Sequence, residues 1–135
     1  MAKGALYYHS DFPFHDGQRG KKLFVVLNDP QNDEPYLVVK TTSQLHNKTY
    51  QNGCNERSGM FFIPAGTEKL FQIPTLLQLI EIYEFSAEEF LKGSMQEKVI
   101  TSLGNFDSTL FAQVINCIRK LKDDISERHF KLITR

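Results

Sequence analysis

The hydrophobic pattern changes its period near residue 85, and this change constrains the fold more than any other feature of the sequence. Before that point, short β-rich apolar runs alternate with stretches rich in Pro, Gly, Asn and Asp, which is typical of strands joined by turns. The expected strands cover residues 4–12, 22–27, 36–42, 60–64 and 75–85. Beyond residue 85 the apolar residues recur at helical spacing, so the sequence predicts a mainly β protein with helices near its C-terminal end.

A complete helix start follows the last of these strands. Ser86 is expected to cap a helix, because Glu89 stands where its side chain can reach back to the cap. Phe85 precedes the cap and can pack on Phe90 in the first turn. These signals predict a short helix near residues 86–91.

A longer helix is expected near residues 107–122, with Asp107 as its cap. Its apolar side chains fall on one face at helical spacing: Leu110, Phe111, Val114, Ile115, Ile118 and Leu121. We expect that face to pack on the sheet. Asp123 and Asp124 oppose the helix dipole, so the helix is expected to fray there.

The expected architecture is a single domain, residues 1–135, built around one core. It has five to six mostly antiparallel strands closed into a small barrel, with the C-terminal helix laid across it. The segment 43–58 is polar and contains Asn52-Gly53, a dipeptide that favours a hairpin turn between 46–50 and the next strand. No function or structure is predicted for segment 92–103.

Charge and composition limit the partners and the location. Lysine plus arginine and aspartate plus glutamate number 16 each, so any anionic partner must be bound by a local patch. No apolar run approaches the roughly 20 residues of a membrane span, and the N-terminus lacks the apolar core of a signal peptide. The expected location is therefore the cytoplasm, with no membrane contact. Cys54 and Cys117 lack metal-site spacing and are expected to be free thiols rather than a disulfide or metal pair, and no metal or cofactor is expected.

A candidate binding surface comes from two segments that contain no acidic residue, 17–28 and 40–52. They supply cations and a histidine: Arg19, Lys21, Lys22, Lys40, Lys48 and His46. If folding brings the two segments together, a basic groove suited to RNA phosphates forms on a neutral protein. The alternative is a solvated loop with lysines that protect an edge strand from aggregation.

Three stretches of the sequence resemble the MazF/PemK family of toxin endoribonucleases. They are "ALYYHSDFPFHDGQRGKKLFVVLND" near the start, "VVKTTSQ" at the end of the third expected strand, and "ITSLGNFDSTLFAQVINCIRKL" leading into the C-terminal helix. The resemblance implies an SH3-like barrel, usually a homodimer, that cleaves single-stranded RNA without a metal. It also implies a separate antitoxin protein as a partner.

The resemblance further implies a set of catalytic residues. Lys21 stands where the family has a phosphate-clamping arginine, and Thr42 matches a threonine whose hydroxyl binds the phosphate. A shift of one residue would put Thr41 on that face instead of Thr42. Arg19 is the expected substitute for the missing arginine, and His15 in the same loop is the expected proton carrier. The expected RNA-binding residues are Gln18, Lys22, Lys40, Ser43, Gln44, His46 and Lys48.

Departures from the family pattern leave two other functions open. Gln78 and Ile80 stand where many members have an arginine and an aspartate, and Tyr83 stands where another arginine is common. Glu81 and Glu84 do not replace the lost acid as a pair, because a spacing of three along a strand turns them to opposite faces. The first alternative is a barrel that has lost catalysis and binds a protein or nucleic acid. The second is inhibition of a protein such as a topoisomerase, as in the related CcdB-type toxins.

Overall fold

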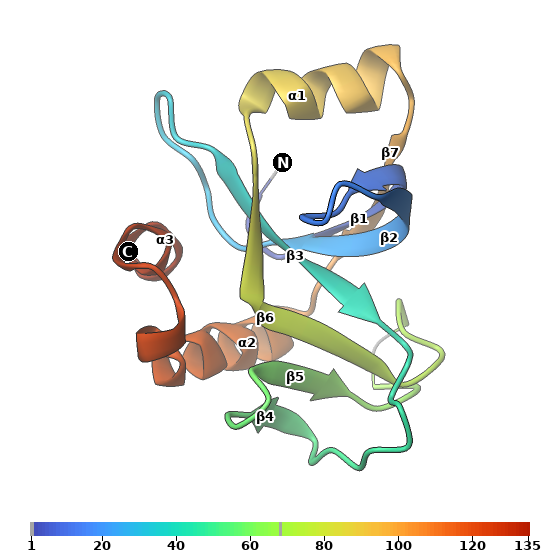
Figure 1. Cartoon of the computed structure of the whole chain (residues 1–135), viewed down its shortest axis with the longest axis vertical. Coiled ribbons are helices and arrows are strands. Elements are labelled where there is room, and N and C mark those ends of the chain that lie inside the picture. Colours follow the sequence, from blue (N-terminus) through green and yellow to red (C-terminus); the bar gives the residue numbers. More distant parts are fainter. Residues whose placement is uncertain (1, 68) are drawn as a thin grey trace.

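The computed structural model describes residues 2–67 and 69–135 and contains one seven-stranded antiparallel sheet with helices on both faces (Figure 1). The strands are β1 (Ala5–Pro13), β2 (Arg19–Val26), β3 (Tyr36–Thr42), β4 (Gly53–Asn55), β5 (Met60–Ile63), β6 (Thr75–Phe85) and β7 (Ile100–Asn105). The helices are α1 (Ala87–Leu91), which continues as a π-helical turn (Lys92–Gln96), α2 (Ser108–Lys120) and α3 (Glu127–Thr134), with a 3₁₀ turn (Lys122–Asp124) between the last two. The predicted mainly β fold is confirmed.

The sheet is open, so the predicted barrel closure is wrong. The strand order is β4-β5-β6-β3-β2-β1-β7, and no pairing joins β4 to β7 within the residues that the structure describes. In a closed barrel one face of the sheet points inward, so no helix has to cover that face. Here α1 covers one face and α2 with α3 covers the other, so the sheet buries apolar side chains on both sides without closing (Figure 1).

Strand β2 contributes to both hydrophobic cores. Val25, and Leu27 directly after the strand, pack in the core beneath α2 and α3, whereas Phe24 and Val26 pack in the core beneath α1. All of these side chains are fully buried. The apolar end of this strand is therefore buried on both faces of the sheet.

The predicted start of α1 is confirmed in detail. The Ser86 Oγ accepts a hydrogen bond from the Glu89 backbone N–H at 3.0 Å, and the Glu89 carboxylate accepts one from the Ser86 N–H at 3.2 Å. Phe90 is buried in the core beneath this helix. The cap therefore fixes where the chain leaves β6 and turns over the sheet.

Asp107 caps α2 as predicted, through its carboxylate and the N–H groups of Thr109 and Leu110. The helix ends at Lys120, but the chain then forms α3 instead of fraying. Ser126 caps α3 by accepting a hydrogen bond from the His129 N–H at 3.2 Å. The prediction that this helix ends near Asp123 and Asp124 is confirmed, whereas α3 beyond it was not predicted.

A disulfide joins Cys54 on β4 to Cys117 on α2, with an S–S distance of 2.02 Å. The prediction of free thiols is wrong, because the fold brings two cysteines 63 residues apart to a Cα–Cα distance of 5.4 Å. The predicted hairpin turn at Asn52-Gly53 is also misplaced, since β4 begins at Gly53 and the turn to β5 follows Asn55. In the part of the chain that the structure describes, no helix has the length and apolarity of a membrane span.

Candidate nucleic-acid interface

The start of β2 and the end of β3 share a pocket of about 240 Å³. We call it the strand-end pocket. Among the residues that line it are Lys21, Lys22, Thr42, Ser43 and Tyr8. The rest of its lining comes from Leu23 on β2, Thr41 on β3, the segment before β6 and the first residue of β6: Leu70, Phe71, Gln72, Ile73 and Thr75. The structure thus brings together several of the predicted catalytic and RNA-binding residues.

The register of the sheet decides which threonine offers its hydroxyl. Phe24 pairs with Lys40, so continuing the register places Lys22 opposite Thr42, with both side chains on one face. Thr41 also lines the pocket but is only 5% exposed, whereas Thr42 is partly exposed. The Thr42 Oγ1 accepts a hydrogen bond from the Gln44 N–H at 3.1 Å, which leaves its own hydrogen free to be donated.

Lys22 is a half-buried cation in this pocket. Its Nζ donates a hydrogen bond to the backbone carbonyl of Thr41 at 2.9 Å. Neither Lys22 nor Lys21 takes part in any ion pair among the described residues. Burial, reinforced by the nearby charge of Lys40, lowers the pKa of Lys22. Among the described residues, therefore, no carboxylate compensates the positive charge of the pocket.

A second polar cluster surrounds Glu81 on β6, and we call it the carboxylate cluster. Glu81 Oε1 lies 2.6 Å from the Lys40 Nζ, and its Oε2 accepts a hydrogen bond from the Tyr83 hydroxyl at 2.6 Å. The His15 Nδ1 lies 3.3 Å from the same Oε2. The imidazole stacks on the Tyr83 ring at a centroid distance of 3.7 Å. His15, although it lies in a loop, is thus held against two residues of β6.

The carboxylate cluster shifts two pKa values in opposite directions. Burial and the hydrogen bond to Glu81 raise the pKa of Tyr83 to about 12. Burial acts to raise the pKa of Glu81, but hydrogen bonds from Lys40 and Tyr83 outweigh it and hold that pKa below its usual range. Near neutral pH the cluster therefore contains an ionised carboxylate and a protonated phenol.

Other predicted site residues lie elsewhere. The Arg19 guanidinium binds Asp11, through its Nε to the carboxylate at 2.9 Å and through its Nη2 to the backbone carbonyl at 3.1 Å. Arg19 does not line the strand-end pocket, and neither do the exposed side chains of Gln18, Gln44 and His46. Lys48 lines a different cavity.

Sequence reasoning missed Glu81 and Tyr83 as members of a site. The prediction that Glu81 and Glu84 face opposite sides is confirmed, since Glu84 binds Arg128 and His129 of α3. The sequence contains no local signal for the pairing of β3 with β6, which brings Lys40 next to Glu81. That pairing contains a register shift between Val39 and Thr41, so strand alternation alone cannot place the two charges together.

Comparison of the chain with protein-family models, with curated proteins and with solved structures found no match.

Proposed function

We propose that this protein binds single-stranded RNA at the strand-end pocket and cleaves it as a toxin-like, metal-independent endoribonuclease. The observation that carries the proposal is Lys22, a half-buried ammonium with no carboxylate partner among the described residues, beside Lys21 and the Thr42 hydroxyl. Burying an uncompensated charge is costly, so such a site gains most from an anionic ligand. A backbone phosphate supplies the counter-charge and accepts the hydrogen bonds.

The proposed reaction transfers the phosphoryl group within the RNA from the 5′-oxygen to the neighbouring 2′-oxygen. The 2′-oxygen loses its proton to His15 and forms a bond to the adjacent phosphorus, and the bond to the 5′-oxygen breaks. Lys22 returns a proton to that oxygen, so the products are a 2′,3′-cyclic phosphate and a 5′-hydroxyl. Lys21 and the Thr42 hydroxyl stabilise the charge on the phosphate oxygens in between.

The relationship to the MazF/PemK family is part of this proposal. With it come an SH3-like arrangement of the central strands, a homodimer and a separate antitoxin protein as partner. Barrel closure is not included, because the sheet is open. Arg19 has a smaller role than the sequence predicted, because its guanidinium is already bound to Asp11.

The direct test is incubation of the purified protein with a long, end-labelled single-stranded RNA in the presence of EDTA. We expect cleavage by the wild type and a loss of roughly a hundredfold or more in Lys21→Ala and Thr42→Ala, in line with the loss of groups that stabilise developing charge. Lys131→Ala, an exposed lysine on α3, removes the same charge away from the pocket and is expected to cleave normally. A wild-type protein that leaves the RNA intact without added metal would refute the proposal.

A second candidate function is RNA binding without turnover. Two observations favour it: Glu81 neutralises Lys40, and Gln78 and Ile80 provide no acid or base where the resemblance expects one. In that case the same assay would show a stable complex and no cleavage products, and Lys21→Ala would weaken the complex.

A further inference from the structure

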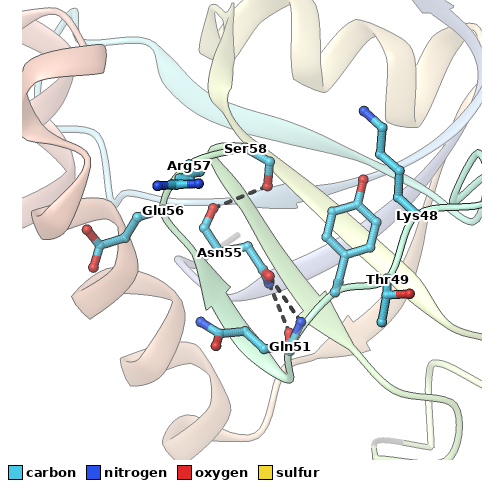
Figure 2. Close-up of a pocket in the computed structure, with 8 residues that line it drawn as sticks. Lys48, Thr49, Gln51, Asn55, Glu56, Arg57 and Ser58 are labelled. Atoms are coloured by element: carbon cyan, nitrogen blue, oxygen red, sulfur yellow. Dashed lines mark hydrogen bonds between the residues drawn. The ribbon is translucent and has the colours of Figure 1, made fainter.

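The segment before β4 and the turn after it line a second, open pocket of about 600 Å³, which we call the hairpin pocket (Figure 2). Residues 48–51 and 55–58 line it. Its volume falls within the range of small-molecule sites, roughly 300–1,000 Å³. None of its lining residues belongs to the strand-end pocket.

The hairpin pocket is held in shape by its own polar contacts. The Asn55 side chain binds the backbone of Gln51 at both ends, donating to its carbonyl at 2.9 Å and accepting from its N–H at 3.1 Å (Figure 2). The Ser58 Oγ donates to the Asn55 carbonyl at 3.3 Å. A disulfide at Cys54 anchors the same hairpin to α2. A ligand would therefore meet a wall that is already ordered.

The lining combines one aromatic ring with two cations. The Tyr50 ring stacks on Phe62, with centroids 6.0 Å apart and an interplanar angle of 25°. Lys48 and Arg57 take part in none of the ion pairs found among the described residues. The one carboxylate of the lining belongs to Glu56 and lies 3.9 Å from Lys120. The set suits a ligand with a flat ring and a negative charge.

We propose that the hairpin pocket is a nucleotide subsite, in which a base stacks on Tyr50 and the backbone phosphates contact Lys48 and Arg57. This inference rests on the proposed function, because it takes the nucleotide to belong to the RNA bound at the strand-end pocket. Residues 43–47 connect the two pockets and span at most roughly 20 Å. A single RNA strand of the usual length for one binding domain, about 4–16 nucleotides, can reach both.

Binding is measured by fluorescence anisotropy with a labelled twelve-nucleotide RNA that carries 2′-O-methyl groups and so cannot be cleaved by 2′-oxygen attack. Tyr50→Leu is expected to weaken binding roughly 5- to 100-fold, the effect of losing one stacked base. Tyr50→Phe keeps the ring and is expected to bind within about twofold of the wild type. The double variant Lys48→Gln/Arg57→Gln is expected to lower the slope of log affinity against log salt by about 1.4, whereas Lys131→Gln leaves it unchanged.

The outcomes separate the subsite from the proposed function. If Lys21→Ala weakens binding but Tyr50→Leu and the double variant do not, the subsite is wrong and the strand-end interface stands. If the wild type does not bind the RNA, both fail. If Tyr50→Phe lowers the affinity for the RNA as much as Tyr50→Leu does, the ring does not stack on a base and the inference is overturned. Should Tyr50→Leu unfold, as circular dichroism would show, the salt slope of the double variant decides.

Discussion

Lys21 and Lys22 are adjacent residues with different surroundings. We therefore expect different roles: Lys22 donates a proton, and Lys21 supplies only its charge. Lys22 is held by the Thr41 carbonyl, faces Lys40 from β3 and pairs across the sheet with the buried His9 on β1. These surroundings lower its pKa, so its ammonium is a better acid than that of an ordinary lysine. Lys21 lines the same pocket, and only its charge is expected to matter there.

We therefore predict opposite outcomes for the two arginine substitutions in the RNA cleavage assay. Arginine keeps the charge but does not release its proton near neutral pH. Lys22→Arg should slow cleavage roughly a hundredfold, the usual contribution of a general acid. Lys21→Arg should stay within a few-fold of the wild type. In single-turnover rates, the wild type should lose activity as the pH rises through the pKa of Lys22; equal rates for both variants would show that charge alone acts at position 22.

Glu81 binds three side chains at once, so replacing it should destabilise the folded protein and disturb the positions of these side chains. Glu81→Gln leaves Lys40, whose side chain is only 11% exposed, without its counter-charge. The carboxylate itself is 40% exposed, so solvent screening limits the loss to about 1–2 kcal/mol at pH 7. Because the pKa of Glu81 is lowered in the folded state, this stabilisation is present above the unfolded pKa and disappears as the pH falls through the folded value.

Urea unfolding at pH 7 and pH 3 tests this. The difference between wild type and Glu81→Gln should be clear at pH 7 and smaller at pH 3. The control is Glu88→Gln, an exposed glutamate in α1 that should change stability by less than about 0.5 kcal/mol. A loss that is equally large at both pH values would mean that ionisation of Glu81 is not its source.

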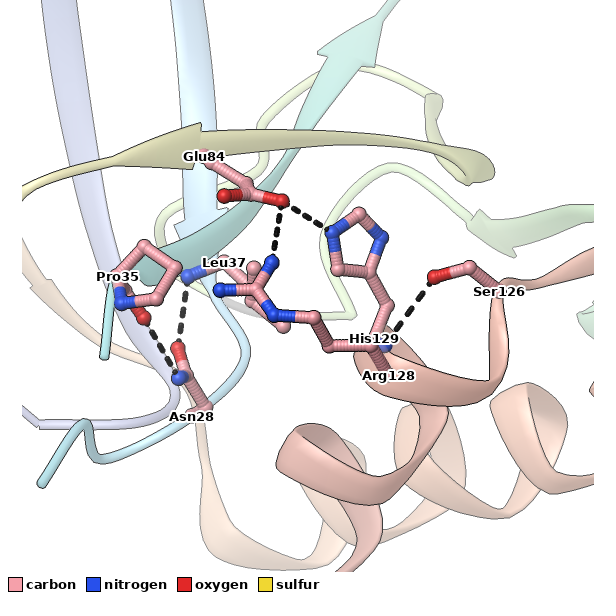
Figure 3. A network of polar contacts seen from close by, with 7 residues as sticks. All are labelled: Asn28, Pro35, Leu37, Glu84, Ser126, Arg128 and His129. Atoms are coloured by element: carbon pink, nitrogen blue, oxygen red, sulfur yellow. Dashed lines mark hydrogen bonds and ion pairs between the residues drawn. The ribbon is translucent and has the colours of Figure 1, made fainter.

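At the scale of elements, α3 is attached to the rest of the molecule by Ile133, which packs in the main core, and by ion pairs with carboxylates. Figure 3 shows Glu84 between Arg128 and His129, with contacts of 2.8 and 2.6 Å. Arg135 binds Glu34 in the loop before β3 through two hydrogen bonds. Only Ile133 of this helix is buried. The docking of α3 should therefore depend on charge more than that of α2 does.

Acid should release α3 before it unfolds the sheet. The hydrogen bond from His129 holds the pKa of Glu84 below its usual range, and the hydrogen bonds from Arg135 and from the Gln31 N–H lower that of Glu34 to about 2. Both pKa values are lowered, so the docking is complete above about pH 4.5 and is lost as the pH falls toward 2. Hydrogen exchange should show the amides of α3 losing protection in this window while those of β2 keep it. Simultaneous loss in both elements would contradict a separate docking equilibrium.

Elements with strong local signals were predictable, and those that depend on distant contacts were not. A few neighbouring residues are enough to recognise the apolar runs of β2, β3 and β6 and the caps Ser86 and Asp107. Strand β4 has three residues and is stabilised by β5 and the disulfide, so it carries no pattern of its own. In β7 most side chains are exposed, and Gly104 interrupts the alternation. The Ser126 cap was a visible signal for α3 that the two preceding aspartates obscured.

The same division holds for the candidate site. Lys21, Lys22 and Thr42 were predictable because each lies at the end of a recognisable strand. The partners of His15 were not, because its contact with Glu81 joins a loop to a strand more than 60 residues away. Local sequence thus indicates which groups can bind phosphate, and only the long-range pairing of β3 with β6 shows which group can position the histidine.

On the scale of the whole molecule, the open sheet leaves its β4 edge to be secured by something other than a neighbouring strand. β4 is short, and its residues are only partly buried. The disulfide from Cys54 to Cys117 fixes this edge to α2, whose buried face includes Val114 and Ile118. A covalent tie here links the outermost strand of the sheet to the main core.

We predict that removing this tie destabilises the whole chain. The bond closes a loop of 63 residues, for which the chain-entropy model gives about 4 kcal/mol, with measured losses commonly 2–5 kcal/mol. Cys54→Ala/Cys117→Ala should therefore unfold at lower urea concentration than the oxidised wild type. Dithiothreitol should lower the wild-type midpoint toward that of the variant and leave the variant unchanged. If the oxidised and reduced proteins unfolded at the same midpoint, packing of β4 on β5 would have to secure this edge by itself, and the hairpin pocket would keep its shape without the bond.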